Sequence, residues 1–194
     1  MKQNIQKILE EYKSKYNRLE LDLACGSSKK EDSIGVDISD EIGVDIIWDL
    51  NQYPWPFEDN SIDSIHCSHY VEHIPHNINN GDKRDGLIQF MNELYRILKP
   101  EGKVTIIAPY YTSIRAYGDP THQRFICDWT FLYYNKEWRD SNKLSHYGII
   151  ANFDSIINYH ISEEMSLRSE QVRNKAFMEN WNAVDDIMVE LTKI

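Results

Sequence analysis

Short apolar runs recur along the first 109 residues, and each is bounded by glycine, proline, asparagine, aspartate or serine. Runs of about four to eight residues that are apolar at nearly every position are typical of strands in a parallel sheet covered on both faces. Five such strands are predicted, at Leu19–Ala24, Ser33–Ile38, Val44–Trp48, Ile62–Cys67 and Lys103–Pro109.

Two segments instead show the apolar spacing of amphipathic helices. A helix is predicted over the first 17 residues, with an apolar face formed by Ile5, Ile8, Leu9, Tyr12 and Tyr16. Its opposite face carries lysines and an arginine, which indicates either a solvated surface or a contact with an anion. The second helix, Gly86–Leu98, lies between the fourth and fifth strands, so these strands are expected to be joined by a right-handed parallel crossover.

The chain changes character after Pro109. Residues 110–150 are rich in tyrosine, tryptophan, histidine and arginine and show weak periodicity, as expected of a binding crevice beyond the carboxyl ends of the strands. Regular elements then resume with a strand at Phe153–His160, a helix around Glu163–Asn182 and a last strand at Asp186–Lys193. Apolar and polar residues alternate along the last strand, which predicts an antiparallel terminal pair with one more exposed face.

Composition and charge narrow the possible partners. The chain of 194 residues carries 21 Lys+Arg against 31 Asp+Glu, a formal charge of -10, which argues against nonspecific binding to a phosphate backbone but leaves room for a local basic patch. The three cysteines, Cys25, Cys67 and Cys127, are too far apart for a zinc ribbon, and their odd number does not suggest a disulfide framework. We therefore expect a soluble, cytoplasmic protein with no membrane association.

Three aspartates follow the predicted strands closely. Asp22 lies within the first strand, Asp37 ends the second and Asp49 follows the third. Each alone would be explained as a helix cap or a turn residue. Because the carboxyl ends of parallel strands form the ligand-binding edge of a sheet, the three together favour a binding site, and Asp37 is placed to accept the hydroxyls of a ribose.

The turn after the first strand, ACGSS, limits which nucleotide could bind. A dinucleotide fingerprint requires three glycines and a Walker loop requires Gly-Lys-Ser/Thr, whereas this turn contains only Gly26. The turn therefore favours a ligand that is smaller or less anionic than a pyrophosphate.

Four stretches, LDLACG, GVDIS, WDLNQYPWPFEDNSIDSIHCSHYVEHI and ELYRILKPEGKVTIIAPY, occur in this order. Between Leu19 and Pro109 the chain thereby resembles a class I S-adenosylmethionine-dependent methyltransferase, of the broad group that modifies small molecules, lipids, glycans and other acceptors. The resemblance implies an α/β, Rossmann-like sheet of seven strands with an antiparallel last strand. It also implies S-adenosyl-L-methionine as the cofactor.

The resemblance also implies a set of cofactor contacts. The methionyl part would lie against the first turn, the ribose and adenine against the ends of the second and third strands, and the sulfonium just past the fourth. By position, these contacts fall on Asp22, Ala24, Cys25, Gly26, Asp37, Ile38, Asp49, Leu50, Ser68 and His69.

This turn departs from the family pattern in two ways. Ala24 must adopt a tight backbone geometry, because Gly26 is the one glycine. Only ten residues, Ala24 to Ser33, separate the first two strands, so the first crossover helix is expected to be one turn or absent. The N-terminal helix is the first candidate to cover the sheet face that this leaves open.

The acceptor side is expected in the stretch RAYGDPTHQRF and its neighbours. His122 or Asp119 could take a proton from an acceptor hydroxyl or amine, and His69 would lie beside them as a third catalytic candidate. Tyr110, Tyr111, Arg115 and Arg124 are predicted to bind the acceptor. The alternative is a loop held by its own ion pairs, with Trp129, Tyr133, Tyr134 and Trp138 serving as ordinary packing rather than as an apolar or sugar-stacking wall.

His69, His73 and His76 also raise the question of a metal. A metal site needs a third protein ligand and usually a supporting carboxylate, and no H-E-x-x-H pattern occurs here. We expect no metal, and we interpret Glu72 and His73 as a structural pair at the edge of the substrate site.

The expected organisation is one domain. It comprises an N-terminal helix (1–17), a cofactor-binding half (18–109), a substrate-side insertion (110–150) and a C-terminal strand-helix-strand unit (151–194). The expected function is methyl transfer by in-line displacement to an oxygen or nitrogen of a small-molecule or glycan-like acceptor. The chain has CSHY after the fourth strand, where DNA amine methyltransferases carry a Pro-Pro tetrad. An RNA or nucleotide methyltransferase and a non-catalytic cofactor-binding module remain as alternatives.

Overall fold

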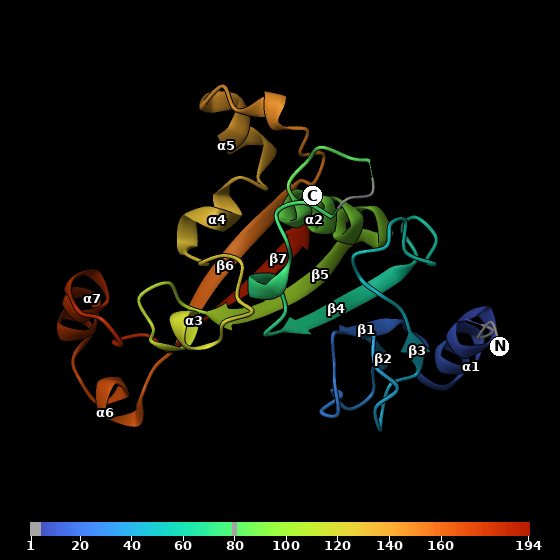
Figure 1. Ribbon diagram of the computed structural model, residues 1–194, viewed down its shortest axis with the longest axis horizontal. Coiled ribbons are helices and arrows are strands. Elements are labelled where there is room, and N and C mark those ends of the chain that lie inside the picture. The colour runs from blue at the N-terminus through green and yellow to red at the C-terminus, as the bar shows by residue number, and fades with distance from the viewer. Residues whose placement is uncertain (1–4, 79–80) are drawn as a thin grey trace.

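The computed structural model describes residues 5–78 and 81–194, so the start of the predicted N-terminal helix lies outside the described residues. Seven strands form one sheet in the order β3-β2-β1-β4-β5-β7-β6 (Figure 1). All neighbours from β3 to β5 are parallel, and β7 runs antiparallel to both β5 and β6. The predicted α/β fold with a reversed last strand is therefore confirmed. The strands are β1 (Glu20–Leu23), β2 (Ile34–Asp37), β3 (Ile46–Ile47), β4 (Ile62–Ser68), β5 (Leu98–Pro109), β6 (Phe153–His160) and β7 (Asp186–Lys193).

Helix α2 (Gly86–Ile97) covers the middle of the sheet and gives the crossover between β4 and β5. Its predicted apolar face is buried, since Leu87, Met91 and Leu94 all belong to the core. Asp85 caps the helix by accepting a hydrogen bond from the Leu87 amide at 2.8 Å. The chain passes from α2 straight into β5, which begins five residues earlier than the predicted strand.

The connection between β1 and β2 contains no helix. Carboxylates at the neighbouring strand ends hold it instead, since Asp22 accepts the Lys30 amide at 2.7 Å and Asp37 accepts the Gly26 amide at 2.9 Å. Helix α1 (Ile5–Tyr16) lies beside the amino ends of β1 and β2, at the opposite end of the sheet from α6 and α7 (Figure 1). The short crossover is therefore stabilised by its own hydrogen bonds.

Gly35 in β2 lets this connection pack directly on the sheet. A Cβ atom at this position would lie 2.8 Å from the Cys25 sulfur and 2.8 Å from the Gly43 carbonyl oxygen. Both distances are far shorter than a normal van der Waals contact, and the second involves backbone that cannot rotate away. The sequence at this position is thus dictated by the close approach of two loops.

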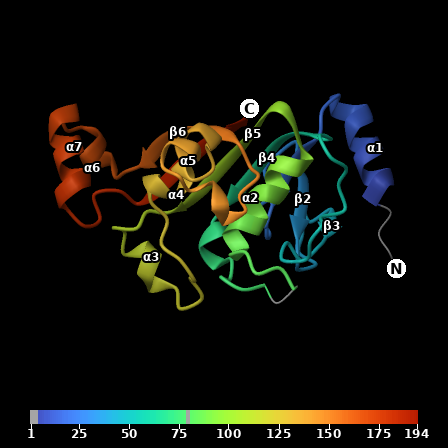
Figure 2. The ribbon, with the colours of Figure 1, turned by 90° about the horizontal axis from the view of Figure 1, so that it is seen from above.

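The C-terminal half adds short helices on one side of the sheet and leaves part of the other side open. Helices α3 (Arg115–Gly118), α4 (Asp128–Leu132) and α5 (Lys136–Ser141) and the 3-10 turn η2 (Ser145–Tyr147) follow β5 (Figure 2). An earlier 3-10 turn, η1 (Val71–His73), follows β4. The predicted alternation in β7 is confirmed, because Ile187, Val189 and Leu191 are buried while the residues between them are half-buried. Ile156 in the neighbouring β6 is 60% exposed on the open face.

The helix predicted around Glu163–Asn182 is two helices, α6 (Glu163–Ser166) and α7 (Glu170–Glu179). The break arises because Ser169 has extended backbone and its hydroxyl accepts the Val172 amide, which starts a new helix. The continuous prediction was wrong because a serine inside a polar periodic pattern can be a cap as well as a helical residue.

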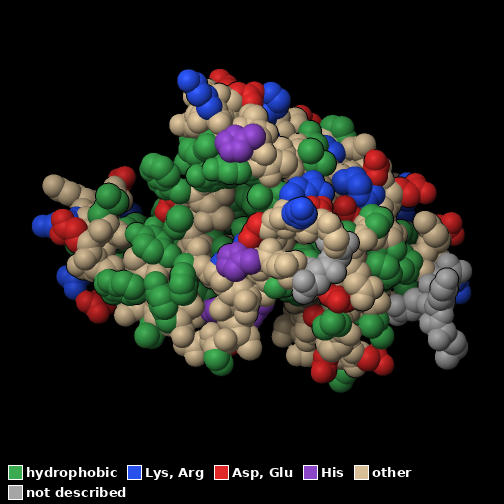
Figure 3. Space-filling model, turned by 45° about the horizontal axis from the view of Figure 1, so that its top comes forward, with side chains coloured by type: hydrophobic (Ala, Val, Ile, Leu, Met, Phe, Trp, Pro, Cys, Tyr) green, Lys and Arg blue, Asp and Glu red, His purple; other side chains and the backbone are tan. Residues whose placement is uncertain are grey.

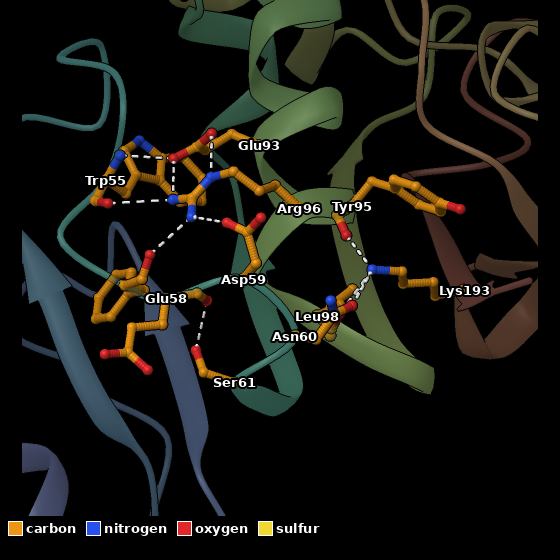
Figure 4. Close-up of polar contacts among 11 residues, drawn as sticks. Trp55, Glu58, Asp59, Asn60, Ser61, Glu93, Tyr95, Arg96, Leu98 and Lys193 are labelled. Carbon is orange, nitrogen blue, oxygen red and sulfur yellow. Dashed lines mark hydrogen bonds and ion pairs between the residues drawn. The ribbon is translucent and has the colours of Figure 1, made fainter.

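A half-buried arginine and a buried lysine fix the end of the sheet that lies away from the ligand-binding edge (Figure 4). Arg96 binds Glu93 at 2.6 Å and Asp59 at 2.7 Å, and it donates to the carbonyls of Trp55 and Phe57. Lys193 donates to the Tyr95 and Leu98 carbonyls and to Asn60. These contacts attach the irregular segment 48–61 and the end of β7 to α2.

No helix within the described ranges is long and apolar enough to cross a membrane.

We predict that Gly35→Ala destabilises the protein by about 1–3 kcal/mol, because the added methyl group overpacks the contact between two loops. Gly118→Ala is the matched control, since a Cβ atom there meets nothing within 4 Å. Urea unfolding followed by circular dichroism measures both variants. Equal stability of the two would contradict the close packing described for Gly35.

Candidate active site

A cleft of about 180 Å³ opens at the carboxyl ends of β1, β2 and β3. Five of the predicted cofactor residues line it, namely Ala24, Asp37, Ile38, Asp49 and Leu50. Sequence reasoning missed Trp48, Asn51 and Tyr70, which complete the lining. Each of these three residues lies one or two positions from a predicted contact. They were missed because the spacing of residues in a sequence does not show in which direction a side chain points.

Asp37 lies at the end of β2 and binds the turn after β1 as well as the start of the loop after β2. One carboxylate oxygen accepts the Gly26 amide at 2.9 Å, and the other accepts the amide of Ser39 at 2.9 Å and its hydroxyl at 2.7 Å. Burial alone would raise the pKa of Asp37. The hydrogen bonds lower the pKa by more than burial raises it, so the net pKa lies below the ordinary value. The group is an ionised acceptor at neutral pH, and each of its oxygens can accept more than one hydrogen bond.

The turn after β1 has the tight geometry that was predicted for it. Ala24 and Gly26 both have left-handed backbone, with φ of 54° and 51°. Cys25 is buried between them, and burial raises the pKa of its thiol to about 11, so the sulfur is neutral. Asp22 is also buried and holds the far end of the turn, so in this structure it and Cys25 shape the turn from behind rather than line the cleft.

Asn51 is the most informative of the missed residues. Its backbone amide donates to Asp49 at 2.9 Å, which fixes the segment beneath the cleft. Its side-chain oxygen is buried and has no hydrogen-bond partner among the described residues. A buried unsatisfied acceptor in a ligand cleft is suited to a donor on the ligand.

Ser68 and His69 lie at the carboxyl end of β4, as predicted, next to the entrance of this cleft along the sheet edge. His69 has left-handed backbone (φ 53°), and its amide donates to the Ile107 carbonyl of β5 at 2.8 Å. Its imidazole Nδ1 lies 3.4 Å from the Glu72 carboxylate, which raises the pKa of His69. The left-handed turn therefore directs the imidazole back over η1.

Residues far apart in the sequence meet beside η1. The backbone carbonyl of Glu72 accepts the amides of Gln123 at 2.7 Å and Arg124 at 3.3 Å, which brings the loop after α3 against η1. One ligand atom from each of Glu72, His73 and His122 lies within 4.8 Å of the other two. In Figure 3, histidine side chains come to the surface at the middle of the face and below it and, separately, near its top.

The other predicted acceptor residues are held by partners within the protein. Asp119 accepts both the amide and the hydroxyl of Thr121, at 2.7 Å and 2.6 Å. Arg124 binds Asp85 at 2.8 Å and the Ile74 carbonyl, and Arg115 binds Asp186 at 2.7 Å. Asp119 and Arg124 thereby shape the loop that carries His122.

The predicted tyrosines differ in exposure. The Tyr110 hydroxyl donates to Asp128 at 2.7 Å within the core, whereas Tyr111 is 40% exposed. A separate, largely apolar cleft of about 290 Å³ lies between α2, α4 and η2. Tyr133, Tyr134 and Tyr147 line it, so part of the predicted aromatic wall forms a cavity.

Comparison with known proteins identifies this arrangement. The sequence profile of a family described as a methyltransferase domain matches residues 21–106, which contain the turn after β1, Asp37, Asp49 and the carboxyl end of β4. The match spans 86 of the 194 residues and shows a methyltransferase domain in this part of the chain. A methyltransferase domain is that of an enzyme. No curated protein sequence matches this methyltransferase.

Solved structures agree with the fold of the methyltransferase. A SAM-dependent methyltransferase from Archaeoglobus fulgidus is similar over 97% of this chain and 93% of its own, with 23% identity and a TM-score of 0.61. Geranyl diphosphate C-methyltransferase from Streptomyces coelicolor A3(2), solved with Mg²⁺, geranyl diphosphate and S-adenosyl-L-homocysteine, is similar over 97% of this chain and 77% of its own, with 12% identity and a TM-score of 0.52. At these identities the likeness establishes the fold and leaves the acceptor open.

We predict that Asp37→Ala weakens binding of S-adenosylmethionine at least about tenfold, because a hydrogen bond to a charged acceptor contributes roughly 1.5–3 kcal/mol. Asp40→Ala is the control, since Asp40 is an exposed acid of the same loop. Calorimetric titration with the cofactor measures both variants, and thermal unfolding checks that the turn held by Asp37 survives. Unchanged affinity in a folded Asp37→Ala variant would remove Asp37 from the site.

Proposed function

We propose that this methyltransferase transfers the methyl group to an oxygen or nitrogen of a small-molecule or glycan-like acceptor. The observation that carries the proposal is the composition of the acceptor side, where half-buried imidazoles and an aromatic cleft occur and the nearby arginines are already paired with aspartates. Such a lining suits a compact acceptor with a polar reacting group on an apolar or ring-shaped body.

In the proposed complex the cofactor extends along the sheet edge from β3 to β4. The adenine would lie in the 180 Å³ cleft between Ile38 and Leu50, with the free oxygen of Asn51 accepting from its amino group. The ribose hydroxyls would donate to Asp37. The methionyl part would follow the turn at Gly26, which directs the sulfonium toward Ser68 and His69.

The chemistry required of the protein is modest, since the sulfonium is already a reactive methyl donor. When bound, S-adenosylmethionine would supply a methyl group for in-line displacement by the acceptor oxygen or nitrogen, with S-adenosylhomocysteine as the leaving product. The protein aligns the two reactants and excludes water. The proton released by the acceptor would pass to an imidazole, for which His122 and His69 are the candidates.

His122 has a free nitrogen for this role. Its Nδ1 lies 2.9 Å from the Ala116 carbonyl, which can only accept, so Nδ1 carries the hydrogen and Nε2 has the lone pair. Asp119 supports the same loop through Thr121 and acts on position rather than directly on a proton.

A nucleic-acid acceptor is the second candidate, and it has less support. Binding to a phosphate backbone depends on unpaired cations. Here the formal charge is -10, and Arg84, Arg115 and Arg124 each bind an aspartate. An RNA acceptor would have to be recognised through stacking on the aromatic side chains.

The acceptor class is tested by methyl transfer from labelled S-adenosylmethionine to extracted metabolites, to glycans and to RNA in parallel. We expect label in the metabolite or glycan fraction and none in RNA. Label in RNA alone would reverse this ranking. Cofactor binding without label in any fraction would favour a non-catalytic binding module.

We predict that His122→Ala lowers turnover while S-adenosylmethionine binds as in the wild type, because His122 lies on the acceptor side and outside the cofactor cleft. His146→Ala, in the exposed turn η2, is the control and is expected to leave turnover unchanged. Initial rates at saturating cofactor and calorimetric titration give the two readouts. If turnover of His122→Ala equals that of the control, His122 has no part in the reaction.

A further inference from the structure

Glu72, His73 and His122 form a cluster of three groups that can bind a metal ion, whereas accepting a proton requires only one imidazole. Glu72 is only 2% exposed, and neither of its carboxylate oxygens accepts a hydrogen bond from any described residue. Nδ1 of His69 lies 3.4 Å from one of these oxygens and forms an ion pair with it when the imidazole is protonated. A carboxylate removed from water without hydrogen bonds is costly, and its second oxygen has no such partner among the described residues, so the position suits a bound cation.

Both imidazoles of the cluster have their tautomers fixed by the surrounding protein. Thr121 donates its hydroxyl hydrogen to Asp119, so at 3.0 Å its oxygen must accept from Nδ1–H of His73. Nδ1–H of His122 donates to the Ala116 carbonyl at 2.9 Å. In both rings Nε2 is therefore the nitrogen with the free lone pair. Metal-binding histidines have this same arrangement, with the second nitrogen donating to a carbonyl or to a group held by a carboxylate.

We propose that Glu72, His73 and His122 bind one divalent transition-metal cation. Two imidazole nitrogens and one carboxylate oxygen suit zinc and its neighbours in the first transition row better than magnesium or calcium, which prefer oxygen ligands. The three ligand atoms lie within 4.8 Å of one another. A cation bound at about 2.1 Å from each would draw them to roughly 3.5 Å, a change that side-chain rotation can supply.

The site is compatible with entry of a cation from solvent. His73 and His122 are both half-buried, and their rings lie 4.7 Å apart between centroids, tilted by 78°. Three protein ligands leave coordination positions open, as in catalytic rather than structural metal sites. The site lies at η1, directly after the carboxyl end of β4. A cation on Nε2 of His122 would occupy the lone pair that otherwise takes the proton of the acceptor, so with the cation bound that role would fall to His69. The proposal rests on the proposed function only for its location near the acceptor.

No metal was expected from the sequence, because the sequence does not show that a third ligand lies near Glu72 and His73. His73 and the carboxylate of Glu72 are adjacent in the sequence, but the third ligand lies 49 residues beyond His73. The amides of Gln123 and Arg124 bind the Glu72 carbonyl, so backbone pairing brings His122 to the other two.

Cobalt binding to the tag-free protein, without cofactor or acceptor, tests the site directly. We expect one Co²⁺ per chain, visible by its d–d absorption, displaced by Zn²⁺ and retained in millimolar Mg²⁺. Absence of stoichiometric Co²⁺ binding would overturn the proposal, and displacement by Mg²⁺ would overturn the assignment to a transition metal. Because neither cofactor nor acceptor is present, failure here would leave the methyl-transfer proposal standing.

Variants locate the cation. Glu72→Gln and His122→Ala are each expected to abolish the absorption, whereas His146→Ala retains it. Thr121→Val removes the acceptor of the His73 Nδ1–H together with the hydroxyl's own bond to Asp119, and it is expected to weaken Co²⁺ binding about ten- to a hundredfold. Far-ultraviolet circular dichroism and cofactor titration establish that each variant is folded. Co²⁺ binding that survives in folded Glu72→Gln, or is equally lost in His146→Ala, would place the cation elsewhere.

Discussion

The connection between β1 and β2 constrains the rest of this methyltransferase. Ten residues are too few to return along the sheet with a packed helix, so the chain must turn directly beneath its own strand ends. Carboxylates make this possible, because Asp22 and Asp37 accept the amide hydrogens that a helix would otherwise have satisfied. The same demand places Ala24 and Gly26 in left-handed backbone and allows no side chain at residue 35. The cofactor cleft is formed by the surfaces that this compression brings together.

Most of the sheet, and five of the residues that line the candidate cleft, could be predicted from the sequence, because both follow from local patterns. Buried strands have a recognisable apolar pattern. An aspartate at the carboxyl end of a parallel strand lies at the ligand-binding edge of the sheet, irrespective of how the neighbouring side chains pack. Asn51 was not predictable in this way, because whether it faces the cleft depends on the course of an irregular segment held by Arg96. The break between α6 and α7 depended on one serine hydroxyl.

The acceptor side shows the limit of local patterns more clearly. His122 and Glu72 meet through two backbone hydrogen bonds between segments that share no periodicity. Arg124 then fixes the loop by binding Asp85, the residue that also caps α2. A residue that looks from the sequence like a substrate contact can thus be the support of one. The sequence shows which charged residues are present on this side. Only the structure shows which of the arginines are already bound to aspartates and which could bind a ligand.

The two edges of the sheet also have a consequence for how copies of this protein behave together. An edge strand offers unpaired backbone groups, which invite pairing with another chain. At one edge β3 has only two residues, too few to serve as a template. At the other, the start of β6 is occupied by the segment before α5, since the Phe153 amide donates to the Tyr134 carbonyl at 2.8 Å and Asn135 donates to the Phe153 carbonyl. The shortness of β3 and the covered start of β6 both reduce the length of strand that another copy could pair with.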